Sequence, residues 1–452
     1  MDPRSLLVVV LAAGQGTRMK SARPKVLHKI AGRSMLGHVL AVAQALGADD
    51  LAVVVGPGMD AVRAEALGHA PHAKVFVQEV QRGTADAVLA AREAIGGHSG
   101  DVVVLYADTP LLPLSALEAL RARLDAGAAI SVLGFEAADP TGYGRLLIDG
   151  EGWLTAIREE KDANPAERQV RICNAGVMAF RVGDVLGLLT RIGNSNAKGE
   201  FYLTDAVEIA RASGERAGIA MCAEEDVLGV NSRDQLAAAE AIFQRRARLA
   251  VMAEGATLIA PETVWLSYDT KIGRDVVIEP NVFFGPGVTV EDGAEILANC
   301  YFERARIGRN ARVGPFARLR PGADLGERTH VGNFVEIKNS TLGTGSKANH
   351  LSYVGDGDIG AGVNIGAGTI FCNYDGFAKH RAEVGDGAFI GSNTSLVSPV
   401  KIGAGAYIGS GSVITKNVPA DALALERSSQ EERPGWAAKF RTMMAKRKAK
   451  AD

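Results

Sequence analysis

The 452-residue sequence is poor in cysteine, in aromatic side chains and in long apolar runs. Its cysteines form no CxxC pair, which argues against a zinc site or a disulfide framework and favours reduced thiols in a cytoplasmic protein. The apolar run Leu6–Ala13 is too short for a membrane span of roughly 20 residues, so we expect a first strand and no membrane partner. A net charge of −2 argues against nucleic-acid binding.

Glycine, in contrast, is abundant: it supplies 53 of the 452 residues, well above the usual ~7%. Residues 262–419 hold 25 of these glycines, which predicts many tight backbone corners in the second half. The hydrophobic content of 47% and the charged content of 23% are typical of a globular protein. At roughly 150 residues per domain, the length predicts two or three domains.

Through the first half, short segments rich in Val, Leu and Ile alternate with helical segments. The strand-like segments are Leu6–Ala12, Leu51–Val55, Lys74–Val77, Asp101–Tyr106 and Ala129–Phe135, and the helical ones are Met35–Leu46, Met59–Leu67, Gly83–Ile95 and Leu114–Leu124. This alternation is typical of a mostly parallel α/β sheet covered on both faces. We therefore expect a Rossmann-like first domain with functional loops at the carboxyl ends of its strands.

From Leu266 to Ile414, apolar residues recur every six positions and are often followed by glycine, as in Ile307-Gly308 and Ile390-Gly391. A period of six fits neither a helix nor an ordinary sheet. It is typical of a parallel β-helix, in which each six-residue face points one aliphatic side chain inward, and about eight coils are expected. The period is lost between Phe371 and Val384, which predicts a loop leaving the coil.

These patterns divide the chain into four parts: a first domain (1–230), a linker helix (231–255), the β-helix (256–419) and an arm with a basic tail (420–452). We interpret the linker as a connecting helix with a solvated arginine-rich side. The tail is predicted to be solvated and frayed.

The loop Leu11–Met19 follows the first strand directly, and its glycines let backbone N–H groups approach a phosphate. Met19 stands where a dinucleotide fingerprint needs a third small residue. Arg18 lies in this loop and Lys25 follows it closely, and two fixed cations at a glycine loop suit a triphosphate. Asp108 ends another strand, where it can hold Mg²⁺ or cap the next helix.

Polar side chains collect where the β-helix becomes irregular. A β-helix can serve oligomerisation alone, but these residues suggest chemistry: Arg320, Lys338, His350, Tyr353, Asn364, Asn373, Tyr374 and Lys379. Histidine titrates near neutrality, so His350 is a candidate general base. Nothing in the sequence activates Cys372 as an acyl carrier, so we prefer direct transfer.

Together, these motifs resemble the bifunctional N-acetylglucosamine-1-phosphate uridylyltransferase/glucosamine-1-phosphate N-acetyltransferase family. The resemblance runs from Leu6 to Arg427 and includes Leu11–Met19, Pro24–His28, Gln81–Ala85, Tyr143–Arg145, Glu159–Asp162, Asn174–Gly176, Gly229–Asn231, His350–Tyr353 and Cys372–Lys379. It implies acetylation of glucosamine 1-phosphate by acetyl-CoA, followed by uridylyl transfer from UTP. It also implies a left-handed β-helix and a homotrimer with acetyl-transfer sites between subunits.

For the uridylyl site, the resemblance implies that Arg18 and Lys25 handle phosphates and that Asp108 and Asn231 hold Mg²⁺. The implied contacts to UTP and the sugar nucleotide are Leu11, Ala13, Gly14, Lys25, Gln78, Gln81, Gly83, Thr84, Tyr106, Asp108, Gly144, Glu159, Asn174 and Asn231. The sugar phosphate is itself the nucleophile, so the protein mainly positions the reactants and neutralises charge.

For the acetyl-transfer site, the resemblance implies that His350 is the base. The implied glucosamine-phosphate contacts are Arg320, Lys338, Tyr353, Asn364 and Lys379, and the implied acetyl-CoA contacts are Ala367, Asn373, Tyr374, Ser392, Ser410 and Arg427. The alternative is a single-activity sugar-1-phosphate nucleotidyltransferase whose β-helix is structural or regulatory. A non-catalytic scaffold is the second alternative.

Overall fold

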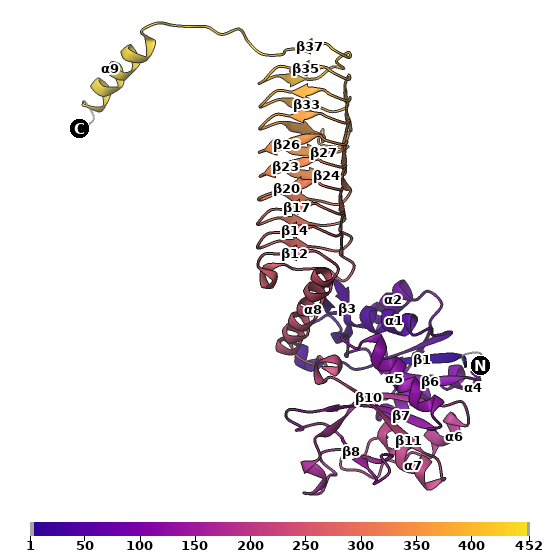
Figure 1. Cartoon of the computed structure of the whole chain (residues 1–452). Coiled ribbons are helices and arrows are strands. Elements are labelled where there is room, and N and C mark those ends of the chain that lie inside the picture. Colours follow the sequence, from indigo (N-terminus) through magenta and orange to yellow (C-terminus); the bar gives the residue numbers. More distant parts are fainter. Residues whose placement is uncertain (1–3, 450–452) are drawn as a thin grey trace. The chain divides into compact units, whose positions relative to one another are not determined.

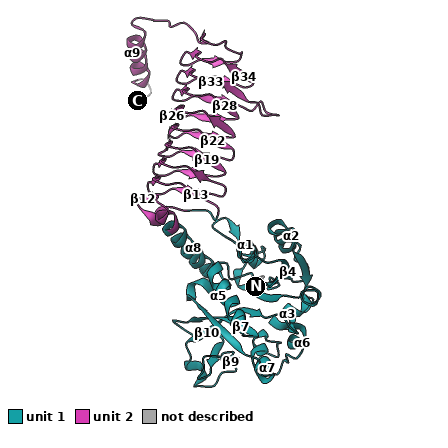
Figure 2. Cartoon of the chain, turned by 45° about the vertical axis from the view of Figure 1, so that its right-hand side comes forward, with its two compact units in different colours: residues 1–249, 266–268 teal, residues 250–265, 269–452 magenta. Residues whose placement is uncertain are grey.

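The computed structural model describes residues 4–449, which divide into two compact units. Unit 1 contains the chain up to Leu249 together with Leu266–Tyr268, and unit 2 contains Ala250–Trp265 together with the residues from Asp269 onward (Figure 2). The division along the chain falls near the end of α8, Arg233–Ala253.

Unit 1 is built on a nine-stranded sheet in the order β5-β4-β1-β6-β10-β7-β11-β9-β8. The strands are β1 (Leu6–Leu11), β4 (Asp50–Val55), β5 (Lys74–Val77), β6 (Asp101–Tyr106), β7 (Ile130–Glu136), β8 (Arg145–Ile148), β9 (Leu154–Arg158), β10 (Ile172–Phe180) and β11 (Ala217–Cys222). The first four strands of this order are parallel, as predicted. β10 runs antiparallel to both β6 and β7, so the sheet is mixed rather than purely parallel.

The side chains along each central strand point alternately into two apolar cores, one on each face of the sheet. In β1, Leu6, Val8 and Val10 face one core and Leu7, Val9 and Leu11 face the other. The first core includes residues of α1 (Met35–Ala45), α2 (Asp60–His69) and α5 (Leu114–Asp125), and the second includes residues of α3 (Thr84–Ala90), α4 (Arg92–Gly96), α6 (Val185–Thr190) and α7 (Ala206–Ala212). Helices therefore cover both faces of the sheet, as predicted.

Two local predictions in unit 1 need correction. The segment predicted as one helix over Gly83–Ile95 forms two, α3 and α4, because the backbone leaves helical geometry at Ala91 (φ −91°, ψ 19°). The basic side of α8 is not simply solvated. Arg246 donates to Asp226 at 2.7 Å and to the Leu111 carbonyl at 3.0 Å, so it holds α8 against the rest of unit 1.

Unit 2 is a parallel β-helix whose three sheets stack coil upon coil (Figure 1). The first sheet contains β12 (Thr257–Leu258), β14 (Val277–Ile278), β17 (Glu295–Ile296), β20 (Arg312–Val313), β23 (His330–Asn333), β26 (Lys347–His350), β29 (Asn364–Ile365), β32 (Phe389–Ile390), β35 (Tyr407–Ile408) and β37 (Leu423–Ala424). The second contains β13 (Lys271–Ile272), β16 (Thr289–Val290), β19 (Ala305–Ile307), β22 (Ala323–Leu325), β25 (Ser340–Leu342), β28 (Gly357–Ile359), β31 (Ala382–Val384) and β34 (Val400–Ile402). The third contains β15 (Phe283–Phe284), β18 (Tyr301–Phe302), β21 (Arg318–Leu319), β24 (Glu336–Lys338), β27 (Tyr353–Gly355), β30 (Ile370–Cys372), β33 (Ser395–Val397) and β36 (Val413–Ile414).

The register of these sheets explains the sixfold pattern. Ile278 pairs with Ile296, and Ile296 pairs with Val313, so each coil uses 17 or 18 residues and buries one aliphatic side chain per face. Between Ile365 and Ile390 the spacing grows, because a loop leaves the coil between β30 and β31, as predicted.

The glycines of unit 2 serve close stacking as well as corners. A Cβ on Gly391 would lie 2.4 Å from the backbone nitrogen of Ser410 in the next coil, so only glycine fits after the buried Ile390. Several left-handed corners, in contrast, carry Asn or Asp, such as Asn339 (φ 46°) and Asp356 (φ 53°). The glycine surplus therefore reflects the close stacking of the coils as well as the tight backbone corners that the sequence analysis predicted.

The C-terminal tail is helical where a frayed segment was predicted. α9 spans Trp436–Lys448, and its residues have no buried side chains. Among the described residues, no helix is both long and apolar enough to cross a membrane.

Candidate functional site

The first candidate site is a cavity of about 310 Å³ at the carboxyl ends of β1 and β6. It is lined by Leu11, Ala12, Ala13, Gly14, Lys25, Val26, Gln78, Gln81, Gly83, Thr84, Ala87, Tyr106, Asp108 and Glu200. Apart from Ala12, Val26, Ala87 and Glu200, every lining residue is one that the sequence analysis assigned to nucleotide binding. The structure therefore brings the glycine loop, the 78–84 segment and the strand ends together, as parallel topology requires.

The 78–84 segment is held against the glycine loop by a side-chain hydrogen bond. The Gln81 amide donates to the Ala13 carbonyl at 2.5 Å. Gly83 adopts φ 130°, and a Cβ there would lie 2.4 Å from the Phe201 carbonyl oxygen. Because only glycine permits this approach, the segment can form one wall of the cavity.

Asp108 and Asn231, the two residues predicted to hold Mg²⁺, each direct an oxygen atom at the ammonium group of Lys25. Nζ of Lys25 lies 2.5 Å from Oδ2 of Asp108 and 2.9 Å from Oδ1 of Asn231. The Lys25 side chain is only 9% exposed, so this positive charge is held inside the site. A carboxylate and an amide oxygen that converge on one positive charge are the hard donors Mg²⁺ prefers, so the donor set fits that ion.

Arg18 lies on the turn after the glycine loop, where its side chain is exposed and does not line the cavity. Arg233 of α8 anchors this turn by donating to the Met19 carbonyl and to Nδ1 of His28, each at 3.2 Å. Sequence reasoning missed Arg233, because its role depends on contacts to residues more than 200 positions away.

The residues predicted on the sugar side form a separate group. The Asn174 N–H donates to the Gly144 carbonyl at 2.8 Å, and a Cβ on Gly144 would lie 3.2 Å from the Glu159 carboxylate. Burial raises the pKa of Glu159. Tyr106 connects this group to the cavity, since its ring packs against Gly176.

The second candidate site follows one corner of the β-helix in unit 2. Its corner column consists of Asn333, His350, Ala367, Ser392 and Ser410, which take equivalent positions on successive coils. The residue that directly follows His350, Ala367, Ser392 or Ser410 donates its N–H to the carbonyl of the column member on the preceding coil. For example, Gly411 donates to the carbonyl of Ser392. The predicted base therefore lies in one line with three of the predicted acetyl-CoA contacts, Ala367, Ser392 and Ser410. Arg427 joins the line by donating to the Ser410 carbonyl at 3.0 Å.

The orientation of His350 is set by Asn333. Nδ1 of His350 lies 2.7 Å from Oδ1 of Asn333, and the two residues are register partners on β26 and β23. Because an amide oxygen only accepts, Nδ1 carries the proton and Nε2 keeps its lone pair. Asn333 was not among the predicted residues. The one-coil spacing of 17 residues is the signal that could have found it.

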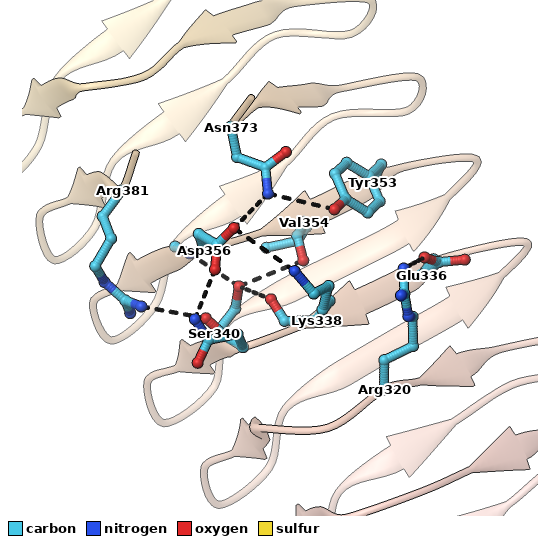
Figure 3. A network of polar contacts seen from close by, with 11 residues as sticks. Arg320, Glu336, Lys338, Ser340, Tyr353, Val354, Asp356, Asn373 and Arg381 are labelled. Carbon is cyan, nitrogen blue, oxygen red and sulfur yellow. Dashed lines mark hydrogen bonds and ion pairs between the residues drawn. The ribbon is translucent and has the colours of Figure 1, made fainter. Parts of the chain in front are cut away.

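Most predicted sugar-phosphate contacts lie beside the corner column, on the third sheet and its loop. Lys338 belongs to β24 and Tyr353 to β27. Nδ2 of Asn373 donates to the Tyr353 hydroxyl at 3.4 Å (Figure 3). A bridge between Tyr374 and Lys379 closes the loop as a small hairpin.

Two cations in this group are close neighbours. The proximity of the Lys338 amine lowers the pKa of Lys379. Arg320 is paired with Glu336 at 2.8 Å, apart from the lysines, and Asn364 lies on β29 of the first sheet. Adjacent ammonium groups suit a phosphate dianion.

Comparisons with known proteins agree with this division. Residues 8–170 match the model of the MobA-like NTP transferase domain, and residues 269–304, 304–339 and 381–416 match the model of the bacterial transferase hexapeptide (six repeats). The bifunctional protein GlmU of Azorhizobium caulinodans is 62% identical over 448 residues, covering 99% of this chain and 100% of the relative. GlmU of Xanthobacter autotrophicus is 59% identical over the same length, with 99% and 100% covered, and GlmU of a Bradyrhizobium species is 57% identical, with 98% of each chain covered. At this identity along nearly the whole chain, the protein belongs to the bifunctional GlmU family.

Proposed function

We propose that the chain catalyses two consecutive steps toward UDP-N-acetylglucosamine, each in its own unit. It is a bifunctional transferase: unit 2 acetylates glucosamine 1-phosphate, and unit 1 transfers uridylyl to the resulting N-acetylglucosamine 1-phosphate. The observation that carries this proposal is the presence of two separate polar sites in a chain that matches its bifunctional relatives along nearly its full length.

In unit 1, the cavity binds UTP, and the sugar phosphate attacks the α-phosphorus while pyrophosphate leaves. The 78–84 segment and the glycine loop receive the uracil, and Gly144, Glu159 and Asn174 receive the sugar. Lys25 and Arg18 neutralise the phosphate charge and hold the reactants in line. Asp108 and Asn231 hold Mg²⁺, which neutralises phosphate charge when bound. Since the attacking phosphate oxygen is already ionised near neutral pH, the chain supplies no strong base.

In unit 2, His350 acts as the general base. An ammonium cannot attack a thioester, so Nε2 of His350 takes a proton from the glucosamine nitrogen. The nitrogen then attacks the acetyl carbon of acetyl-CoA, a C–N bond forms, and the C–S bond breaks as CoA leaves with a proton. Lys338, Lys379 and Arg320 bind the sugar phosphate, with Tyr353 and Asn364 beside them. Acetyl-CoA is bound by the corner-column residues Ala367, Ser392 and Ser410, together with Asn373, Tyr374 and Arg427.

We further propose a cytoplasmic homotrimer. Parallel β-helices of hexapeptide repeats support an oligomer, and the thiols of Cys173, Cys222, Cys300 and Cys372, all free in the structure, support a reducing compartment. Size-exclusion chromatography with light scattering should report three copies of the chain, whereas a monomer mass would contradict the trimer.

One preparation assayed twice tests the proposed function. Glucosamine 1-phosphate with acetyl-CoA should release free thiol, and N-acetylglucosamine 1-phosphate with UTP and Mg²⁺ should release pyrophosphate. Release of pyrophosphate without thiol would favour a single-activity nucleotidyltransferase whose β-helix is structural or regulatory. Release of neither would favour a non-catalytic scaffold.

A further inference from the structure

Asp356 is a buried acid in the acetyl-transfer site that the mechanism above does not use. It sits between β27 and β28 in the left-handed conformation (φ 53°), which aspartate tolerates better than most residues. It is only 4% exposed, although it is charged. A buried charge needs partners, so its surroundings indicate its role.

Each carboxylate oxygen of Asp356 accepts a hydrogen bond from an asparagine. Nδ2 of Asn339 donates to Oδ1 at 2.6 Å from the coil below, and Nδ2 of Asn373 donates to Oδ2 from the loop, as Figure 3 shows for Asn373. The Asn373 amide also reaches the Tyr353 hydroxyl. Asp356 therefore fixes the root of the loop that carries Tyr374 and Lys379.

The same carboxylate faces the two neighbouring lysines. Oδ2 of Asp356 lies 3.9 Å from Nζ of Lys338, whose side chain is only 18% exposed. Burial opposes ionisation of Asp356, but the hydrogen bonds from both asparagines and the charges of Lys338 and Lys379 outweigh it, and the pKa of Asp356 lies below its usual value. The acid is therefore ionised beside two cations.

We propose that Asp356 is a positioning residue for the sugar-phosphate subsite, which orients Lys338 and Asn373 and balances the charge of the adjacent lysines before the phosphate binds. Without this anion, the ammonium group of Lys338, whose side chain is only 18% exposed, would face the charge of Lys379 with no counter-ion. This inference rests on the proposed acetyl-transfer function and names a residue that acts through others.

The substitution Asp356→Asn tests the proposal with little change of shape. Asparagine accepts from one amide only and turns an N–H₂ group toward the other. We expect KM for glucosamine 1-phosphate to rise about 10- to 100-fold, as for a buried charge pair that loses one partner, with a smaller change in kcat and unchanged uridylyl transfer. Asp358→Asn is the matched control, because Asp358 lies two residues away, is 50% exposed and pairs with Arg381 rather than with Lys338 or Asn373.

The pH profile separates positioning from a general structural role. The charged and titratable groups facing Asp356 are Lys338 on β24, Tyr353 on β27, Lys379 on the loop and Arg381 before β31. Lys338 lowers the pKa of Lys379 and Asp356 counteracts this. In Asp356→Asn, the alkaline rise in KM should therefore begin at lower pH than in the parent protein. An unshifted profile would contradict the proposal.

A double variant keeps the test decisive if Asp356→Asn also loosens the fold. In a Lys338→Met background, adding Asp356→Asn should raise KM much less than it does alone, because the lysine it orients is gone. Equal effects in both backgrounds, or an Asp356→Asn variant that matches Asp358→Asn, would overturn the inference. Loss of acetyl transfer in the parent protein would instead count against the proposed function.

Discussion

Asn333 and His350 share one hydrogen bond but have different tasks in the proposed acetyl-transfer mechanism. In that mechanism, His350 accepts the proton, whereas Asn333 only keeps Nε2 available. We expect Asn333→Ala to lower kcat for acetyl transfer about 10-fold, the worth of one hydrogen bond. Asn281→Ala, at an exposed corner of an earlier coil, is the control that should leave kcat unchanged. A loss in Asn333→Ala as large as the ~10²–10⁴-fold expected for a missing base would contradict this division of tasks.

His38 should make the stability of unit 1 pH-dependent. Burial lowers the pKa of His38 to about 4 from its ordinary value of 6.5, and its ring packs edge-on against Phe243 and Tyr268. Since the unfolded chain binds the proton first, stability is complete above pH 6.5 and falls as the pH drops toward 4. The loss should amount to about 3 kcal/mol.

Urea unfolding of His38→Gln at pH 7 and pH 5 measures this effect. The variant should be less stable at pH 7 but should lose less stability than the parent between the two pH values. His72→Gln, at an exposed position, is the control and should follow the parent. If the parent and His38→Gln fall equally with pH, another group is responsible.

Site residues could be predicted from the sequence where a local motif marks them. Lys25 and Asp108 lie in recognisable sequence motifs, and both line the cavity together with the predicted glycine loop. Arg233, Asn333 and Asp356 carry no such mark. Their importance comes from contacts made by coil register or by packing across hundreds of positions, which no short string encodes.

At the scale of elements, the glycines that follow many of the buried aliphatic residues set the spacing of the coils. In Gly391→Ala, the new Cβ would lie 2.4 Å from the Ser410 nitrogen, so the coils must separate. We expect a loss of about 1–3 kcal/mol, the usual cost of overpacking. Circular dichroism during thermal unfolding should show a lower midpoint for the β-helix.

Gly68→Ala is the matched control for this prediction. Gly68 lies in α2 with open space around its Cα, so alanine there should be neutral or slightly stabilising. An unchanged midpoint in Gly391→Ala would contradict the view that glycine fixes the coil spacing.

The elements also differ in how well the sequence predicts them. The β-helix was predictable because each coil repeats the same pattern of six. The strands β8, β9 and β10 were not, because β10 runs antiparallel inside a sheet whose other signals indicate parallel pairing. α9 was predicted as frayed because of its many basic residues, although Ala, Lys, Arg and Met are all good helix formers.

At the scale of the whole molecule, the two sites use different chemistry in different units. Lys25, Asp108 and Asn231 lie in unit 1, and the corner column lies in unit 2. The central claim is that each unit carries one activity, so a substitution in one site should spare the other activity.

Reciprocal variants assayed for both reactions test this claim most directly. His350→Ala should lower acetyl transfer by ~10²–10⁴-fold, the usual worth of a general base, and should leave uridylyl transfer within twofold or so of the parent. Asp108→Ala should impair only the Mg²⁺-dependent uridylyl transfer. If either variant loses both activities equally while remaining folded, the account of two independent sites is wrong.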